Sequence, residues 1–345
     1  GLDLQLDSSR LTGGVTVAFS KRPSFGADFT IDRLNLDAYL PKSTGKKEKA
    51  APKNKAGAPK AKDAQGDTKV KPAENPLAGL KVLTGVDANL KTRIKNLTFQ
   101  GAPIKNVFVD GTLYNGQIEI RRLNIARMAG ASVSLKGVID GLGEVPTVKG
   151  LAFEVKADDV PKLLKFAGID AGAAPKGLGT VTLKGRIDGN LLAPKLNITM
   201  SGAGATAKVS GHIDGLGVLP VVKGLKIQLK AKDASRVLKL AGIEAPALKK
   251  LGAVDLSGVV DGNFLSPSVA MTLKAAGGSV RVQGPVNMLP VGDMLDMTVN
   301  AEYPKLSRLL RALGGGYRPA GKVGGLNLEA RLRGGPKGLT LSGIK

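Results

Sequence analysis

The sequence predicts a mainly β protein: one long antiparallel curved sheet that forms a β-groove, built from repeats of about 73 residues with short amphipathic helices. Three observations predict this fold. Strands with alternating apolar and polar residues recur along the chain, glycine is abundant at 47 residues, and aromatic residues are scarce, with 8 Phe, 4 Tyr and no Trp. Such a composition favours many turns and thin aliphatic strands.

Three segments divide the chain. Residues 1–42 are predicted as a first β segment, residues 43–78 as a disordered Lys/Ala/Pro-rich linker, and residues 79–345 as a repetitive β-groove domain. Residues 42–76 contain ten lysines and four acidic residues, with few large apolar side chains. Because such a segment cannot bury enough surface to offset its ordering entropy, we expect trypsin to cut it while 79–345 resists.

The repeat is a short strand with glycine at its fifth place in six of seven copies. The copies start at Val107, Val133, Val181, Ala207, Val254, Val280 and Leu326, so the spacings are 26, 48, 26, 47, 26 and 46 residues. This alternation of short and long spacings predicts a one-dimensional array of repeats.

Each short spacing predicts a hairpin, and each long spacing predicts another strand and a helix. In one unit, strands at 181–187 and 196–200 are joined through Asp188-Gly189-Asn190, a strong turn signal. A strand at 225–231 then precedes a helix at 232–243. Its counterparts at 158–169 and 303–316 carry Pro161 and Pro304 near the first turn.

The recurrent glycines fall on the apolar side of the alternation, where they predict a bulge, a sharp bend or a close backbone approach. Aligned across strands, they would crease the sheet into an open gutter. A closed sandwich is the alternative, although sandwiches of this size usually contain large aromatic residues in the space between their sheets.

The inner face of the gutter is the candidate binding site. Its continuous aliphatic lining suits acyl chains, because burying each methylene is worth roughly 0.8 kcal/mol. The candidate lipid-binding residues are Val133, Leu135, Val181, Leu183, Leu196, Ile198, Val209, Ile227, Leu229, Val254, Leu256, Val269, Met271, Val280, Val282, Leu326 and Leu328.

Charge and residue types narrow the function classes. The net charge of +23, of which about +17 lies outside the linker, favours polyanions or anionic membrane surfaces. Lys and Arg without interleaved aromatics argue against single-stranded nucleic acid, while duplex binding through charge alone stays open. The chain has no Cys and one His, His212, which we expect to be solvated.

Catalytic, cofactor and metal sites are not predicted. Asp140, Asp188, Asp214 and Asp261 each precede glycine, which indicates turns rather than metal ligands. We therefore expect a protein that is not an enzyme. No run reaches the 18 apolar residues of a spanning helix. Since the sequence opens on Gly1, we expect a fragment or processed form whose anchor lies elsewhere.

Two stretches carry a resemblance to a known family. Residues 86–141, "VDANLKTRIKNLTFQGAPIKNVFVDGTLYNGQIEIRRLNIARMAGASVSLKGVIDG", resemble the C-terminal conserved region of the AsmA family. Residues 29–42, "FTIDRLNLDAYLPK", are similar to the family's Asp-x-Leu-x-Leu-x-x-Tyr-Leu segment. The family's usual pattern lacks the Lys-Ala-Pro insertion.

The resemblance implies a periplasmic protein of Gram-negative bacteria, anchored to the inner membrane by an N-terminal helix outside this chain. It also implies a hydrophobic groove that takes part in phospholipid transport between inner and outer membranes and in outer-membrane assembly. Phospholipid acyl chains and an outer-membrane or envelope protein are the implied partners. The alternative function is an envelope scaffold with a closed β core that binds proteins.

Overall fold

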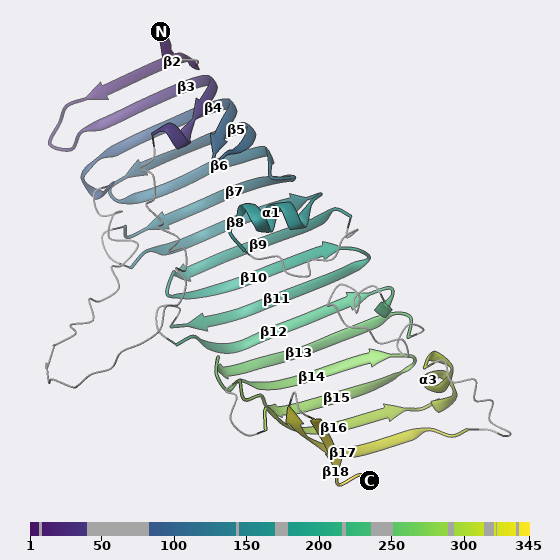
Figure 1. The fold of residues 1–345 in the computed structure, drawn as a ribbon. Coiled ribbons are helices and arrows are strands. Elements are labelled where there is room, and N and C mark those ends of the chain that lie inside the picture. The colour runs from purple at the N-terminus through teal and green to yellow at the C-terminus, as the bar shows by residue number, and fades with distance from the viewer. Residues whose placement is uncertain are drawn as a thin grey trace, which may run out of the picture.

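The computed structural model describes residues 1–6, 9–39, 83–142, 145–169, 179–215, 219–235, 251–288, 293–313, 321, 323–335 and 338–345. In these ranges eighteen strands form one sheet. The strands follow one another in chain order along its length (Figure 1). They are β1 (Leu2–Leu6), β2 (Ser9–Ala18), β3 (Ser24–Asn35), β4 (Asp87–Phe99), β5 (Ala102–Tyr114), β6 (Gln117–Met128), β7 (Ala131–Asp140), β8 (Thr147–Ala157), β9 (Val181–Asn190), β10 (Ala193–Gly202), β11 (Ala205–Asp214), β12 (Val221–Ala231), β13 (Val254–Asn263), β14 (Ser268–Ala275), β15 (Gly278–Pro285), β16 (Leu295–Tyr303), β17 (Leu326–Gly335) and β18 (Gly338–Ser342).

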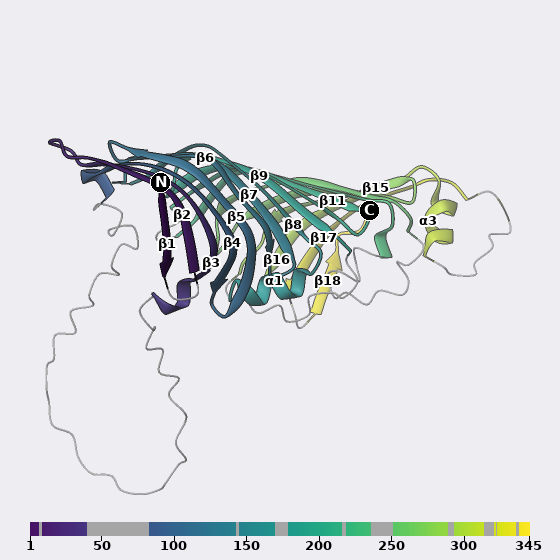
Figure 2. The ribbon, with the colours of Figure 1, turned by 90° about the horizontal axis from the view of Figure 1, so that it is seen from above.

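Each strand pairs with the next one along the chain. Sixteen of these pairs are antiparallel. β3 and β4 are parallel. The sheet is therefore one long antiparallel meander that is interrupted once, by the parallel pair β3 and β4. Seen from above, it is curved (Figure 2).

The parallel pair explains where the Lys/Ala/Pro-rich segment lies. The chain leaves β3 at Asn35 and must return to the opposite edge of the sheet to begin β4 at Asp87. Residues 40–82, which contain the predicted linker at 43–78, lie outside the described residues. The segments predicted as 1–42 and 79–345 contribute strands to the same sheet.

The start of this connection is tied to the sheet by a carboxylate. The short 3-10 helix η1 (Leu36–Ala38) follows β3. Within it, Asp37 accepts hydrogen bonds from the backbone N–H groups of Gln100 and Gly101, at 2.6 and 2.8 Å. Because these groups form the turn between β4 and β5, the entry to the connection is fixed beside that turn.

Tight turns of the Ala-Gly type join three of the hairpins. The φ angles are 49° and 78° at Ala129 and Gly130, and 50° and 76° at Ala203 and Gly204. The third turn, Ala276–Gly277, has φ angles of 50° and 80°. Two positive φ angles are typical of type I′ turns, whose twist matches that of the flanking strands.

Two of the predicted Asp-Gly turns are wrong. β9 continues through Asn190 and turns at Leu191 and Leu192 instead of at Asp188-Gly189-Asn190. β13 likewise runs past Asp261 to Asn263. The amide oxygen of Asn190 accepts the Leu192 N–H at 2.7 Å. The turn is therefore stabilised by Asn190 and not by Asp188.

The two described α-helices follow strands that end at the same edge of the sheet. They are α1 (Val160–Phe166) and α3 (Leu306–Ala312), inside the predicted ranges 158–169 and 303–316. Asp159 caps α1 by accepting the Lys162 N–H at 3.0 Å. The predicted helix at 232–243 lies mostly outside the described residues, which end there at Ser235. None of the described helices has the length and apolar character needed to cross a bilayer.

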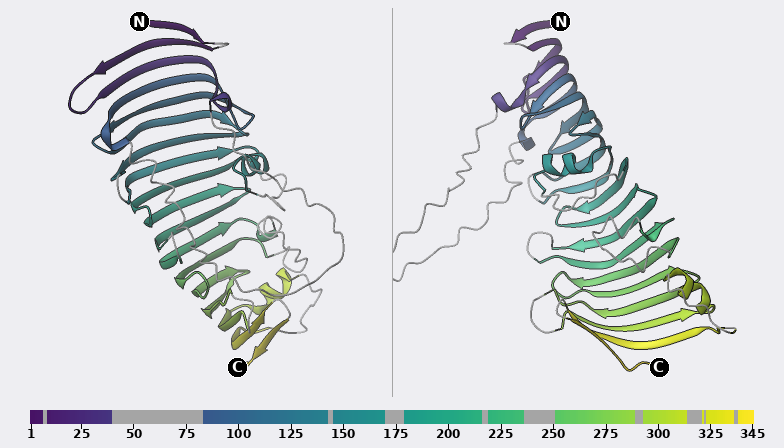
Figure 3. Two further views of the ribbon diagram at one scale, coloured as in Figure 1. Left: turned by 60° about the vertical axis from the view of Figure 1, so that its left-hand side comes forward. Right: turned by 45° about the vertical axis from the view of Figure 1, so that its right-hand side comes forward.

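The described sheet is a single open layer. Its strands contact chiefly the strands beside them, and two further views show no second sheet stacked on either face (Figure 3). Among the described residues, the largest fully buried side chains are Leu142, Val148 and Pro146. The closed sandwich is therefore wrong for this part of the chain, in agreement with its shortage of large aromatic side chains.

The recurrent glycines bring strands close together, but they do not form one line. Gly185 pairs with Ile198, whereas Gly211 pairs with Leu196, two residues along the same strand. The glycines therefore occupy two neighbouring rows of the sheet, and the predicted single crease is wrong.

Candidate functional site

All seventeen predicted groove residues lie on one face of the sheet. Directly paired residues share a face, and the pairing runs from Val133 to Val155 and from Val155 to Leu183. It continues through Met200, Ala207 and Leu229 to Leu256. The other predicted residues follow in alternate positions of the same strands. We call this side of the sheet the apolar face.

One row of the apolar face is uninterrupted from β1 to β17. Each member pairs directly with the next, and none is polar. The row is Leu4, Leu11, Ile31, Ile94, Val107, Ile125, Val133, Val155, Leu183, Met200, Ala207, Leu229, Leu256, Leu273, Val280, Ala301 and Leu328. At about 4.8 Å per strand it extends over about 75 Å.

The sequence prediction missed the part of this row in the first six strands. Leu11, Ile31 and Ile94 precede the first copy of the repeat motif and were not among the candidate residues. Their signal was nevertheless present, because β2, β3 and β4 each alternate apolar with polar residues. Only the parallel pairing of β3 with β4 shows that they extend the same row.

The side chains of the apolar face are half-buried. Each of the seventeen predicted residues is neither buried nor fully exposed. Met200 and Leu4, in the uninterrupted row, are 47% and 44% exposed. Neighbouring strands cover the sides of these residues, while no second layer of described residues covers their ends. An apolar ligand would therefore gain contact area along the row, except at Val107, which is 7% exposed.

The opposite face carries the charges. Glu154 lies between two lysines, with its Oε1 3.2 Å from Lys156 Nζ and 3.4 Å from Lys184 Nζ. The neighbouring Lys156 ammonium is the main cause of the lowered pKa of Glu154. This side of the sheet is therefore polar and solvated, and an apolar ligand has one face on which to bind.

Two of the recurrent aspartates accept hydrogen bonds from backbone N–H groups of a neighbouring strand. Asp188 Oδ1 accepts the Gly150 N–H at 2.6 Å, and Asp261 Oδ1 accepts the Gly224 N–H at the same distance. Both glycines lie where the register between neighbouring strands shifts. Within the described ranges no three His, Cys, Asp or Glu side chains group as metal ligands.

His212 belongs to a polar cluster on the face opposite the apolar face. Its Nε2 lies 2.5 Å from Asp214 Oδ1, and Lys223 Nζ lies 2.6 Å from the other oxygen of this carboxylate. The hydrogen bond from Lys223 is the main cause of the lowered pKa of Asp214. The imidazole is 41% exposed, so it is partly solvated and has a structural partner.

The apolar face is thus the main candidate binding surface of the described residues. The chain matches no family model, no curated protein and no solved structure.

Proposed function

We propose that this protein binds lipid acyl chains along its apolar face and carries phospholipid along the sheet. The supporting observation is the uninterrupted apolar row that crosses seventeen strands, is largely half-exposed, and is covered by no second layer of described residues. Each methylene that leaves water on such a face contributes roughly 0.8 kcal/mol. A chain of fourteen or more carbons therefore gains enough to bind.

The uniformity of the row favours movement over storage. Its members are all apolar and regularly spaced, and fifteen of the seventeen are Leu, Ile, Val or Met, so a bound chain would meet an apolar surface at each strand. No step along the row requires the lipid to desolvate a charge, which would cost far more than one methyl contact. We infer that lipid slides along the row.

The cellular setting is proposed from the resemblance to the AsmA family at residues 86–141 and 29–42. As an AsmA-like protein it would act in the periplasm, anchored to the inner membrane, in phospholipid transport to the outer membrane and in outer-membrane assembly. The net charge of +23 supports contact with anionic membrane surfaces. An envelope protein that covers the apolar face is the competing occupant.

The test places a charge within the row. Leu183→Asp and Leu229→Asp each put a carboxylate on the apolar face, where a passing acyl chain would have to desolvate it. We expect both variants to lose most crosslinking to a phosphatidylcholine with a photoactivatable group in its acyl chain. Normal crosslinking by folded variants would overturn the proposal.

The matched control is Gln228→Asp. Gln228 neighbours Leu229 on β12, is exposed, and points to the opposite face, where it pairs with Lys208. It is a better control than Lys184, whose replacement by Asp would set two carboxylates side by side at Glu154. Circular dichroism would confirm folding, and Gln228→Asp should crosslink like the parent. Equal loss in Gln228→Asp would point to charge repulsion in general instead of a lipid path.

A further inference from the structure

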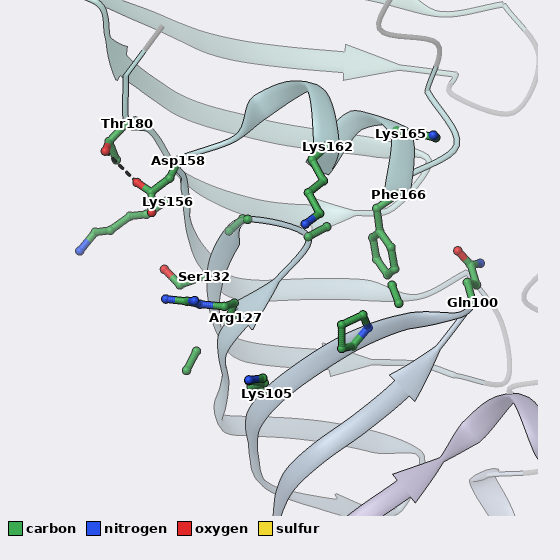
Figure 4. A pocket seen from close by; sticks show the side chains of 16 residues that line it. Gln100, Lys105, Arg127, Ser132, Lys156, Asp158, Lys162, Lys165, Phe166 and Thr180 are labelled. Carbon is green, nitrogen blue, oxygen red and sulfur yellow. Dashed lines mark hydrogen bonds between the residues drawn. The ribbon is translucent and has the colours of Figure 1, made fainter. Parts of the chain in front are cut away.

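A pocket of about 780 Å³ lies at the edge of the sheet where α1 follows β8. Its walls come from α1, from the turns after β4 and β6, and from the ends of β7 and β8. Figure 4 shows Lys162 and Phe166 pointing from α1 toward those turns. Five basic residues line it: Lys105, Arg127, Lys156, Lys162 and Lys165.

Four of the five basic side chains that line this pocket lack a counter-charge among the described residues. Asp158 is the acidic residue in the lining, and its Oδ1 already accepts a hydrogen bond from the Thr180 hydroxyl at 2.8 Å. Lys156 is paired with Glu154. In the part of the chain that the structure describes, the other four basic residues have no carboxylate within salt-bridge distance.

Two of these cations stand directly opposite each other. Lys105 of β5 pairs with Arg127 of β6, on the same face of the sheet. Like charges in this position destabilise a strand pair. An anion bound between them would remove the repulsion, and a phosphate oxygen accepts hydrogen bonds well from both Lys and Arg.

The pocket also reaches the apolar face. Ala131, in its lining, pairs with Met128 and with Ala157, which extends the apolar face to this edge. Phe166 contacts Phe99 edge to face, with ring centroids 6.4 Å apart. A ligand could therefore place a charged group among the cations and an apolar chain on the sheet beside it.

A second pocket, beside the turn at Ala276–Gly277 near α3, shows that the basic lining is not a by-product of the local fold. It lies next to the same type of turn, at the same edge of the sheet. Its charged lining residues are Lys274 and Glu302, one of each sign. The excess of positive charge is thus particular to the pocket at α1.

We propose that the pocket at α1 binds the phosphate of an anionic phospholipid head group, while the acyl chains of the same lipid lie on the apolar face. This inference rests on the proposed function and adds the lipid class and the place of its head group. The phosphate could also come from a free ion, so the experiment separates the two sources.

The experiment compares three probes by titration calorimetry at fixed ionic strength: vesicles of dimyristoyl phosphatidylglycerol, vesicles of dimyristoyl phosphatidylcholine, and inorganic phosphate. The fourteen-carbon chains of both lipids are long enough to bind the apolar face. We expect the parent to prefer phosphatidylglycerol over phosphatidylcholine by about tenfold, through several partly exposed charge contacts. Inorganic phosphate should bind far more weakly than phosphatidylglycerol. Equal affinity for the ion and the lipid would overturn the assignment to a head group.

The variant is Lys105→Glu with Lys162→Glu. Because Glu at position 105 would face Arg127 as an opposite charge, this substitution should not weaken the strand pair. We expect the preference for phosphatidylglycerol to disappear, because its affinity falls by more than that of phosphatidylcholine, whose choline cation already offsets the charge of its phosphate. Arg308→Glu with Arg311→Glu on α3 makes the same change in net charge and should leave the preference intact.

The outcomes separate the two proposals. If the parent fails to bind either lipid, the proposed function fails. If it binds both but Lys105→Glu with Lys162→Glu keeps its preference, or the α3 variant loses it equally, the head-group site is wrong and the acyl-chain surface stands.

Discussion

Two aspartate side chains accept backbone hydrogen bonds at places where the register between neighbouring strands shifts. Where the register between two strands shifts, one backbone N–H loses its acceptor in the ladder. Asp188 and Asp261 supply that acceptor to Gly150 and Gly224 on the neighbouring strands. An Asp-Gly pair in the sequence predicts a turn because the same carboxylate can satisfy a turn N–H. The sequence alone does not say which N–H the carboxylate reaches.

Among the described residues, Asp296 is the carboxylate whose pKa is lowered most by its partners, which are arginine side chains. Arg331 donates two hydrogen bonds to it at 2.7 Å, and Arg333 lies at 3.2 Å. The Arg331 hydrogen bond is the main cause that lowers the pKa of Asp296 from 3.8 to about 2. A pKa lowered by folding means that the contact stabilises β16 against β17 above about pH 4. That contribution is lost as pH falls from about 4 to about 2.

We predict that carboxyl carbon NMR will show Asp296 titrating with a midpoint of about 2. In Arg331→Gln the midpoint should rise toward 3.8, because the main hydrogen-bond donor to the carboxylate is gone. Arg308→Gln, on α3, should leave the midpoint unchanged. A parent midpoint near 3.8 would show that the arginines do not hold the carboxylate.

At the scale of elements, glycine sets how closely two strands approach. Gly137 has φ of +146°, and a Cβ there would lie 2.5 Å from the Leu151 Cα on β8. Gly211 repeats this arrangement with Leu225, where the distance is 2.7 Å. The sequence predicted a close approach at these glycines, and these two positions confirm it. The opposing atoms are backbone, so they cannot move aside as a flexible side chain would.

Gly137→Ala is therefore expected to destabilise the pairing of β7 with β8 by roughly 2 kcal/mol, through the clash and the positive φ. Urea unfolding would measure the loss. Gly14→Ala is the matched control, since Gly14 also lies in a strand and its Cβ would meet nothing within 4 Å. Equal effects of the two substitutions would mean that strand propensity, not close approach, explains the glycine.

At the scale of the whole molecule, local patterns predicted the elements but not how they join. The alternation, the glycines and α1 and α3 all follow from residues close in sequence. The parallel junction between β3 and β4 does not, because it depends on pairing between segments about sixty residues apart. For the same reason the predicted apolar face left out Leu4, Leu11 and Ile31, which lie before this junction.

The length of the connection between β3 and β4 determines how many of its residues can be deleted without breaking the β3–β4 pair. It must span β4, which is 13 residues or about 43 Å. Deleting residues 43–76 leaves 17 residues between Asn35 and Asp87, which reach up to about 58 Å. Deleting residues 40–82 leaves 8, which reach only about 30 Å. We predict that the first deletion keeps the β3–β4 pair and the second loses it.

An engineered disulfide would report on this pair, since the natural chain has no Cys. Asp28 and Lys91 are direct partners in β3 and β4, at a spacing that suits a disulfide. Asp28→Cys with Lys91→Cys should oxidise readily in the parent and in the shorter deletion, and fail to do so in the longer one. Equal oxidation in both deletions would contradict the argument from reach.

The parallel junction also has a consequence for the order of folding. Antiparallel neighbours in this sheet are joined by turns of a few residues or by connections of about twenty residues. Each strand can therefore pair with the preceding one at a small cost in loop-closure entropy. Pairing Phe29 with Thr92 instead closes a loop of more than sixty residues. Because contacts distant in sequence form slowly, we expect β4 to β18 to assemble first and β1 to β3 to join as a separate, later phase.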